Sequence, residues 1–540
     1  MLRIWAVTGG LVRRILLRTA SALAALCLAM PVQAKWYEAS SKHFVVYSDR
    51  GTEQVRIMAS KLERFDAALR QLTGRTDEPI APSNRVTIFM VQSPIDVARL
   101  FGKGGNYVGG FYSSIAGASY AIVPPFIVQE TGENGFAEGV LLHEYAHHFV
   151  SENQSILYPI WLNEGFAEFV STARFEKNGS IGLGLPGQWR GWQLTHQVSV
   201  PAEMLVDSQA YFARRELAFD QFYPRAWLLY HMLTFEASRE GQLAAYAGAL
   251  SRGLNDRDAA IAAFGDLRQL ELDLQSYGRK VTMPYYLIKG ETLRPAQVNV
   301  RELSKEDAEA MPFWMRIRRG LEEGNAEPLA VEVRAMAARN PTSAFVQTIL
   351  GMAEFEADHV DAALAAADTA IAIDPMAIEA HVLKGRAMLA KASRNGATPV
   401  EWNAVRAAFL KANAIDPDHP QPLFLYYASF LSQGFKPTGN ALQALSRALE
   451  LAPYDRVIRA ELAESQVSRA QFEEAKSTIR MLMRDPHSPL GGARIRAVME
   501  KLDERNAEGA RKLLEMSNEE FKAKQEKGDP DSGAGREAAA

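Results

Sequence analysis

The chain has 540 residues, of which 47% are hydrophobic and 23% are charged, and its formal net charge is −4. A chain of this length and composition can bury the cores of two or three domains. It contains no long basic run of the kind that marks nucleic-acid binding, so we expect no nucleic-acid partner.

Residues 1–34 have the pattern of a secretory signal peptide. An apolar stretch over residues 20–30 leads to the small-residue cleavage site Val-Gln-Ala, and four arginines precede it: Arg3, Arg13, Arg14 and Arg18. The only cysteine, Cys27, lies in the apolar stretch, so the exported chain would have no disulfide. We expect a periplasmic or secreted protein. If the segment stays attached, a membrane anchor and a membrane-surface assembly factor are the alternatives.

Residues 35–300 are predicted to form an α+β domain. β-Branched and aromatic residues over 43–48 and 86–91 predict strands, and apolar residues at helical spacing predict a helix over 52–73. Glycines over 104–110 indicate a loop before a further strand pair. We expect the sheet to end in an edge strand beside the metal-binding helix described next, where an extended peptide could pair with it.

The most informative motif is His-Glu-Tyr-Ala-His over residues 143–147. Helix positions four apart lie on one face, about 6 Å from each other, so His143 and His147 can bind one metal ion. Glu144 lies about 100° around the helix, where it can accept a proton from an attacking water. The surrounding residues are apolar, and buried histidines would be costly there without a partner. The motif therefore predicts one Zn²⁺ ion with Glu144 as the general base.

A second helix is predicted to supply the third ligand. Catalytic zinc takes three protein ligands and keeps one position for water. Pro159 is suited to the start of this helix. Glu164 and Glu168 share a face, so we assign Glu164 to the metal and Glu168 to the outer N–H of a ligand histidine. Gly165 would allow the two zinc helices to approach closely.

These two runs resemble the gluzincin metallopeptidases, the group of thermolysin and the aminopeptidase N-type enzymes. The run Trp-Leu-Asn-Glu-Gly-Phe-Ala around Glu164 is similar to the one that carries the third ligand on the aminopeptidase N side. The resemblance implies a thermolysin-like zinc peptidase fold, the zinc ligands His143, His147 and Glu164, and the general base Glu144. It covers about residues 36–285.

The residues of the substrate site match the family less closely. The segment 222–233 is similar to one in which those enzymes keep a tyrosine, which implies that Tyr223 donates its hydroxyl to the oxyanion. A core aromatic residue at a helix start is the alternative for Tyr223, and Tyr211 and Tyr230 are further candidates. Residues 115–123 carry no acidic residue to bind a free amino group, as aminopeptidases do, so the minimal peptidase-MA-like domain is the better match. We expect His148 and His231 to be packed or exposed histidines and not ligands.

Residues 301–500 are predicted to form an all-α solenoid of tetratricopeptide repeats. Prolines recur at intervals of 34, 42, 36 and 33 residues, close to the repeat length of helix–turn–helix units, at Pro341, Pro375, Pro417, Pro453 and Pro486. We expect the insertion over 393–398 to form a loop. Residues 501–540 are predicted to be a helical end followed, beyond Ser517, by a disordered charged tail.

Together these features predict an exported zinc metallopeptidase that hydrolyses peptide or protein substrates. The repeat array would recruit the substrate or a protein partner, because stacked repeats commonly bind an extended peptide or a helix. A spacer or dimerisation element is the alternative for the array. The alternative for the whole chain is a repeat-based adaptor whose peptidase-like domain is catalytically silent.

Overall fold

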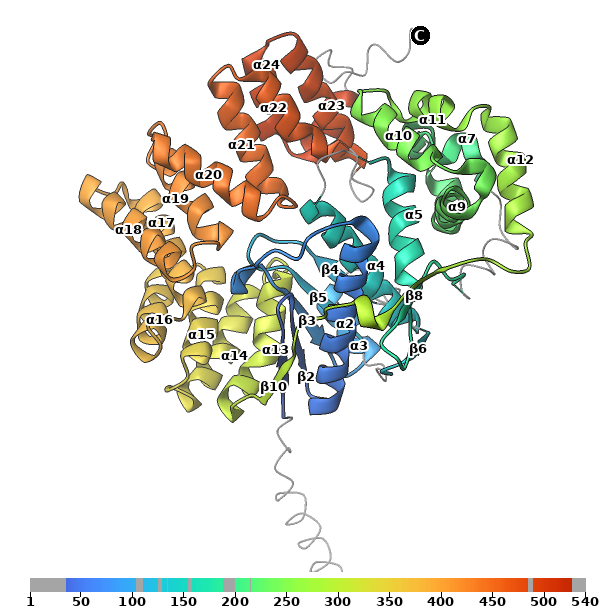
Figure 1. The fold of residues 1–540 in the computed structure, drawn as a ribbon. Coiled ribbons are helices and arrows are strands. Elements are labelled where there is room, and N and C mark those ends of the chain that lie inside the picture. Colours follow the sequence, from blue (N-terminus) through green and yellow to red (C-terminus); the bar gives the residue numbers. More distant parts are fainter. Residues whose placement is uncertain are drawn as a thin grey trace, which may run out of the picture.

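The computed structural model describes residues 35–102, 110–124, 129–133, 135–153, 158–187, 200–213, 215–483 and 489–526. The expected signal segment, with Cys27, lies outside these residues, as does most of the glycine-rich loop. Figure 1 shows a sheet with helices packed on it, a group of helices around α5 (Ile160–Ser171) and α9 (Arg215–Phe235), here called the helical part, and a long curved array of helices from α13 (Lys305–Arg319) onward. None of the helices in the described ranges has both the length and the apolar character that crossing a membrane requires.

The main sheet has the strand order β10-β1-β2-β3-β5-β4. Its strands are β1 (Tyr37–Ser40), β2 (Phe44–Ser48), β3 (Val86–Met90), β4 (Phe111–Ser113), β5 (Tyr120–Val123) and β10 (Asn299–Glu302). β2, β3 and β5 run parallel to one another. β1 is antiparallel to β2, β10 is antiparallel to β1, and β4 is antiparallel to β5. The predicted strands over 43–48 and 86–91 and the predicted helix over 52–73 are confirmed, the helix as α2 (Thr52–Thr73).

Both faces of this sheet are buried under packed helices. Alternate side chains along a strand point to opposite faces, so each strand contributes to both cores. Val86, Ile88 and Met90 of β3 pack with α2 and α4 (Phe136–Asn153) in one core. Phe89, between them, packs on the other side against Trp314 of the first array helix. α3 (Pro94–Phe101) contributes to this second core. The array is therefore built directly onto the sheet.

The remaining elements of the N-terminal half include α5, which packs against α4. They form a small sheet, in the order β6-β7-β8-β9, and a group of helices around α5. The strands are β6 (Gly132–Glu133), β7 (Arg174–Phe175), β8 (Ile181–Leu183) and β9 (Tyr286–Ile288). The helices are α5 (Ile160–Ser171), α7 (Ala202–Leu205), α8 (Ser208–Ala213), α9 (Arg215–Phe235), α10 (Gln242–Ser251), α11 (Asp256–Phe264) and α12 (Leu267–Gly278).

The array begins after the sheet is complete. Because β10 pairs with β1, the main sheet includes residues up to Glu302, close to the expected domain boundary at residue 300. Successive helices then pack as hairpins: α13 (Lys305–Arg319), α14 (Ala326–Arg339), α15 (Ala344–Glu356), α16 (Val360–Ile373), α17 (Ile378–Asn395), α18 (Pro399–Ile415), α19 (Pro420–Ser432), α20 (Gly439–Leu451), α21 (Arg456–Ser468), α22 (Phe472–Ile479), α23 (Pro489–Asp503), α24 (Ala507–Glu515) and α25 (Asn518–Glu526). In Figure 1 the array curves from the sheet, at α13, to the helical part, at α23.

The repeat prolines fall where the sequence predicted them. Pro341, Pro375, Pro417 and Pro453 lie in the connections before α15, α17, α19 and α21, and Pro486 lies outside the described residues. This arrangement is compatible with a tetratricopeptide-like solenoid.

Two expectations about the array are wrong in part. The insertion over 393–398 is only half a loop, because α17 continues to Asn395 and residues 396–398 form the connection to α18, which starts at Pro399. These helices have 18 and 17 residues, against 13 each in α19 and α20, so the extra chain lengthens a hairpin. Residues 518–526 are helical and not disordered, because Phe521 of α25 is fully buried in the last core cluster.

Candidate metal centre

The central helices of the candidate site are α4 and α5, which pack against each other. α4 is fixed from the sheet side, where the Tyr145 hydroxyl donates to the Asp66 carboxylate of α2 at 2.7 Å. α5 is fixed from the other side by α9: a Cβ on Gly165 would lie 2.7 Å from the carbonyl oxygen of Ala226. Gly165 therefore allows α5 to approach α9, and not α4 as we expected.

Three predicted ligands converge between these helices. The Nε2 atoms of His143 and His147 lie 3.1 Å apart. A carboxylate oxygen of Glu164 lies 3.2 Å from the first and 3.3 Å from the second. Two ligands that bind zinc at roughly 2.0–2.1 Å in tetrahedral geometry lie about 3.3–3.4 Å from each other. The observed triangle is close to this size.

The surroundings of Glu164 are those of a ligand. The residue is 1% exposed, and neither carboxylate oxygen has a partner in hydrogen-bond geometry among the described residues. An ionised carboxylate in such a place is costly unless a cation or a donor compensates it. The side chains of His143 and His147 remain 14% and 20% exposed, so water can reach the point on which the three groups converge. The donor set and its spacing fit a zinc ion with an open position.

The electrostatic environment of the three candidate ligands favours a positively charged group or ion. Burial opposes a charge on His143, but the carboxylates of Glu164, Glu168 and Glu144 outweigh it and raise the pKa of His143 to about 9. Burial also opposes the charge of Glu164, yet the two histidines hold the pKa of its carboxyl well below the usual range. Carboxylates therefore surround the two imidazoles, as a cation site requires.

The two other predicted glutamates lie on different sides of this triangle. Glu168 faces the outer nitrogen of His143, with 3.4 Å between its carboxylate oxygen and Nδ1. This is the position from which a carboxylate fixes the tautomer of a ligand histidine. Glu144 is half-buried and has no hydrogen-bond or ion-pair partner among the described residues. Its carboxylate is thus free to act on a water molecule.

Of the three candidate tyrosines, Tyr223 lies beside the centre. Its ring centroid is 6.3 Å from that of His143. Tyr211 is buried and stacks on Phe222, with ring centroids 3.9 Å apart. Tyr230 packs against Phe166 and Phe169 of α5. These environments favour Tyr223 as the candidate that can face a bound substrate.

Comparisons with known proteins do not assign a function to this chain. No protein-family model matches the chain, and no curated protein matches it. The solved structures that it matches include a thermophilic TPR protein of Thermus thermophilus. The two are 17% identical over 32% of this chain and 90% of that chain, with a TM-score of 0.28.

The two histidines that we did not expect to be ligands are both packed. His231 is fully buried, and its ring nitrogens contact the Tyr277 hydroxyl at 2.8 Å and the Pro284 carbonyl at 2.9 Å. Burial lowers the pKa of His231 to about 4. His148 lies in a buried network that sequence reasoning missed: Nδ1 is 2.5 Å from the Tyr112 hydroxyl of β4, and Nε2 is 3.1 Å from Glu152. The spacing of His148 and Glu152, four residues apart on a helix, was the available signal.

A second cluster of histidine and acidic residues does not fit a metal. His43, Asp66 and Asp77 offer ligand atoms within 4.8 Å of one another. However, Arg70 donates to Asp66 at 2.7 Å, and the Lys42 ammonium lies 2.5 Å from Asp77. These cations already balance both carboxylates, so the cluster is an ionic network that ties α2 to the start of β2.

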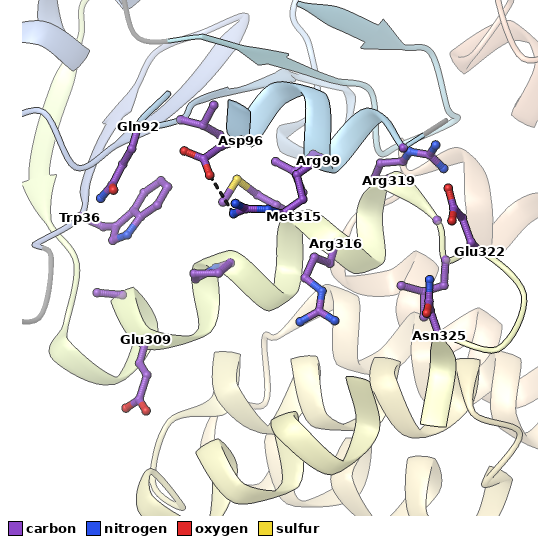
Figure 2. Close-up of a pocket in the computed structure, with 17 residues that line it drawn as sticks. Trp36, Gln92, Asp96, Arg99, Glu309, Met315, Arg316, Arg319, Glu322 and Asn325 are labelled. Carbon is purple, nitrogen blue, oxygen red and sulfur yellow. Dashed lines mark hydrogen bonds and ion pairs between the residues drawn. The ribbon is translucent and has the colours of Figure 1, made fainter. Parts of the chain in front are cut away.

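A cavity of about 780 Å³ lies between α3 and α13, and no predicted metal ligand lines it. Figure 2 shows its side chains, among them Asp96 paired with Arg99. Two other arginines have partners as well, because Arg316 pairs with Glu332 and Arg319 donates to the Phe101 carbonyl. The candidate chemistry is therefore concentrated at α4 and α5.

Proposed function

We propose that this protein is a zinc-dependent metallopeptidase that hydrolyses peptide bonds in peptide or protein substrates. The observation that carries the proposal is the convergence of His143, His147 and Glu164, whose ligand atoms all lie within 4.8 Å of one another, beside the unpaired carboxylate of Glu144. The signal-peptide pattern of residues 1–34 supports export as the setting.

The residues divide the chemistry among them. A zinc ion held by the three ligands would polarise the scissile carbonyl and lower the pKa of water. Glu144 accepts a proton from the attacking water and then delivers it to the leaving amine. Tyr223 donates its hydroxyl to the oxyanion of the tetrahedral intermediate. Glu168 holds the outer nitrogen of His143 and so keeps the ring oriented.

The substrate would lie along the edge of the main sheet. β4 is one of the two edge strands of the described main sheet and packs against α4, where the sequence predicted an edge strand beside the metal-binding helix. An extended peptide that pairs with a free strand edge gains main-chain hydrogen bonds without a demand for particular side chains. This mode suits a peptidase that acts on extended chains.

Glu144→Gln tests the proposal. This variant should keep one zinc ion per chain, as measured by elemental analysis, and should lose cleavage of a peptide library. Wild-type cleavage should stop with a chelator and return with zinc. Cleavage by a zinc-loaded Glu144→Gln variant would exclude the role of Glu144. A wild-type protein that holds zinc and cleaves no peptide would instead support the silent adaptor.

A further inference from the structure

The turn between β4 and β5 packs against the repeat array. This turn, residues 114–119, is closed by hydrogen bonds of its own: Ala118 N–H donates to the Ile115 carbonyl at 2.9 Å, and the Ser119 hydroxyl donates to the same oxygen at 3.2 Å. Ala116 at its tip is 3% exposed and belongs to the core cluster of the array that includes Tyr427 and Tyr454. The tip of a sheet hairpin is thus buried in another part of the chain.

The array meets the turn with the end of α13 and with two connections between its helical hairpins. Asp455, in the connection before α21, accepts from Ala116 N–H at 3.0 Å. Arg318 of α13 donates to the Ala118 carbonyl at 3.0 Å, and it also lies 3.3 Å from Glu379 at the start of α17. We call the residues that contact the turn the connector edge: Arg318, His419, Tyr454 and Asp455. Most of them directly follow the prolines that mark the repeats in the sequence.

Gly117 permits the closest approach in this interface. Its φ is +65°, and a Cβ at this position would lie 2.5 Å from Cε1 of His419. His419 is 1% exposed, so its ring has no room to move outward. Any side chain at residue 117 would therefore push the turn away from the connector edge.

The same interface reaches the helix that carries the metal ligands. The ring of Tyr454 lies 5.1 Å from that of His148, the residue that follows the ligand His147. His148 in turn contacts Tyr112 of β4. One array residue therefore packs at the point where α4 meets the edge strand.

β4 depends on outside support to hold a fixed position. It has only three residues, all of them half-buried, and among the described residues its one partner strand is β5. A strand this short gains little rigidity from its own ladder. The docked turn links β4 to the array, and the contact of Tyr112 with His148 links it to α4.

We propose that Tyr454 is a positioning residue for the metal centre, and that the connector edge holds β4 in place along α4 for an extended substrate. The catalytic part of this inference rests on the proposed function. The chain's own β4–β5 turn occupies this edge of the array. The array would thus act on substrate binding from within the molecule.

A matched pair of glycine substitutions tests the docking in the full-length, zinc-loaded protein. Gly117→Ala and Gly74→Ala introduce the same left-handed alanine, at φ +65° and +66°, but the Cβ of residue 74 meets nothing within 4 Å. Hydrogen exchange over residues 111–123 should speed up roughly tenfold in Gly117→Ala and stay unchanged in Gly74→Ala, because only the first opens the interface. Equal exchange in the two variants would overturn the docking.

A second pair tests the positioning role. Tyr454→Ala should raise KM for an extended peptide roughly tenfold with kcat within about twofold, since it removes binding common to the ground and transition states. Tyr454→Phe keeps the ring and should behave as wild type. Both should retain one zinc ion per chain. An unchanged KM in Tyr454→Ala would overturn the positioning role. A wild-type protein that cleaves no peptide would refute the proposed peptide hydrolysis. The hydrogen-exchange comparison would then test only whether the connector edge holds β4 in place.

Discussion

Replacing Glu164 by glutamine should abolish the stabilisation that zinc gives to this protein. The substitution keeps the shape of the side chain and removes its charge, at a position 1% exposed and 3.2–3.3 Å from both histidine nitrogens. A ligand present at 100 times its dissociation constant stabilises a native protein by about 2.7 kcal/mol. For a domain of 150–250 residues, each kcal/mol raises Tm by roughly 2–4 °C, so zinc should raise Tm by roughly 5–11 °C.

The assay compares each variant with and without zinc. Differential scanning calorimetry of zinc-loaded and chelator-treated protein gives the shift for wild type, for Glu164→Gln and for Glu291→Gln. Effects of a substitution on the fold itself cancel in this difference. Glu291 is a matched control, because its side chain is 77% exposed and far from any predicted ligand in the sequence. We expect the full shift in wild type and in the control, and none in Glu164→Gln. A full zinc shift in Glu164→Gln would refute the assignment of this carboxylate to the metal.

Three further predictions concern the elements that hold the site. Gly165→Ala should destabilise the protein by about 1–3 kcal/mol in urea unfolding, because its Cβ would lie 2.7 Å from a backbone oxygen of α9. Lys61→Met should cost about 3–5 kcal/mol in the same assay, because it leaves the buried carboxylate of Glu138 without its partner. The loss of stability in His43→Gln should be largest between pH 4.5 and 6.5, as urea unfolding over a pH series would show. Burial works against both charges of the His43–Glu63 pair, yet their contact raises the pKa of His43 above 6.5 and lowers that of Glu63 below 4.5. The contribution of His43 is therefore lost as pH rises through its raised pKa, and that of Glu63 as pH falls through its lowered one.

Each of these predictions has its own control. Gly439→Ala places the same methyl group on a helix where nothing lies within 4 Å, and it should not destabilise the protein. The double variant Lys61→Met with Glu138→Leu should recover most of the stability, since an apolar pair can replace a buried ion pair. A loss in His43→Gln that stays constant across the pH range would show that packing and not charge accounts for it.

The candidate ligands could be predicted from the sequence because their geometry is local. His143 and His147 are placed on one side of α4 by helix periodicity alone, and the same periodicity places Glu144 about 100° around the helix from His143. The position of Glu164 needed one further step, a second helix starting at Pro159, which the structure contains. Glu168 follows Glu164 by one turn and therefore faces the same way.

Contacts between elements distant in the chain were not accessible in this way. The sequence indicated that Gly165 permits a close approach, but the partner helix proved to be α9 and not α4. The charged residues beyond Ser517 suggested disorder, whereas Phe521 is buried because it packs against preceding array helices. The first half of the insertion over 393–398 is helical for a similar reason, since the two neighbouring helices of its hairpin lengthen together.

The features that could be predicted from the amino-acid sequence are those that depend on regular spacing. These are the ligand pair on one helix face, the strands over 43–48 and 86–91, and the repeats marked by Pro341 to Pro453. The packing of the array against the sheet could be seen only in the folded chain. That arrangement depends on complementary shape between residues more than 300 positions apart, such as Ala116 and Asp455. No local periodicity encodes such a match, because side-chain packing selects it once both elements have formed.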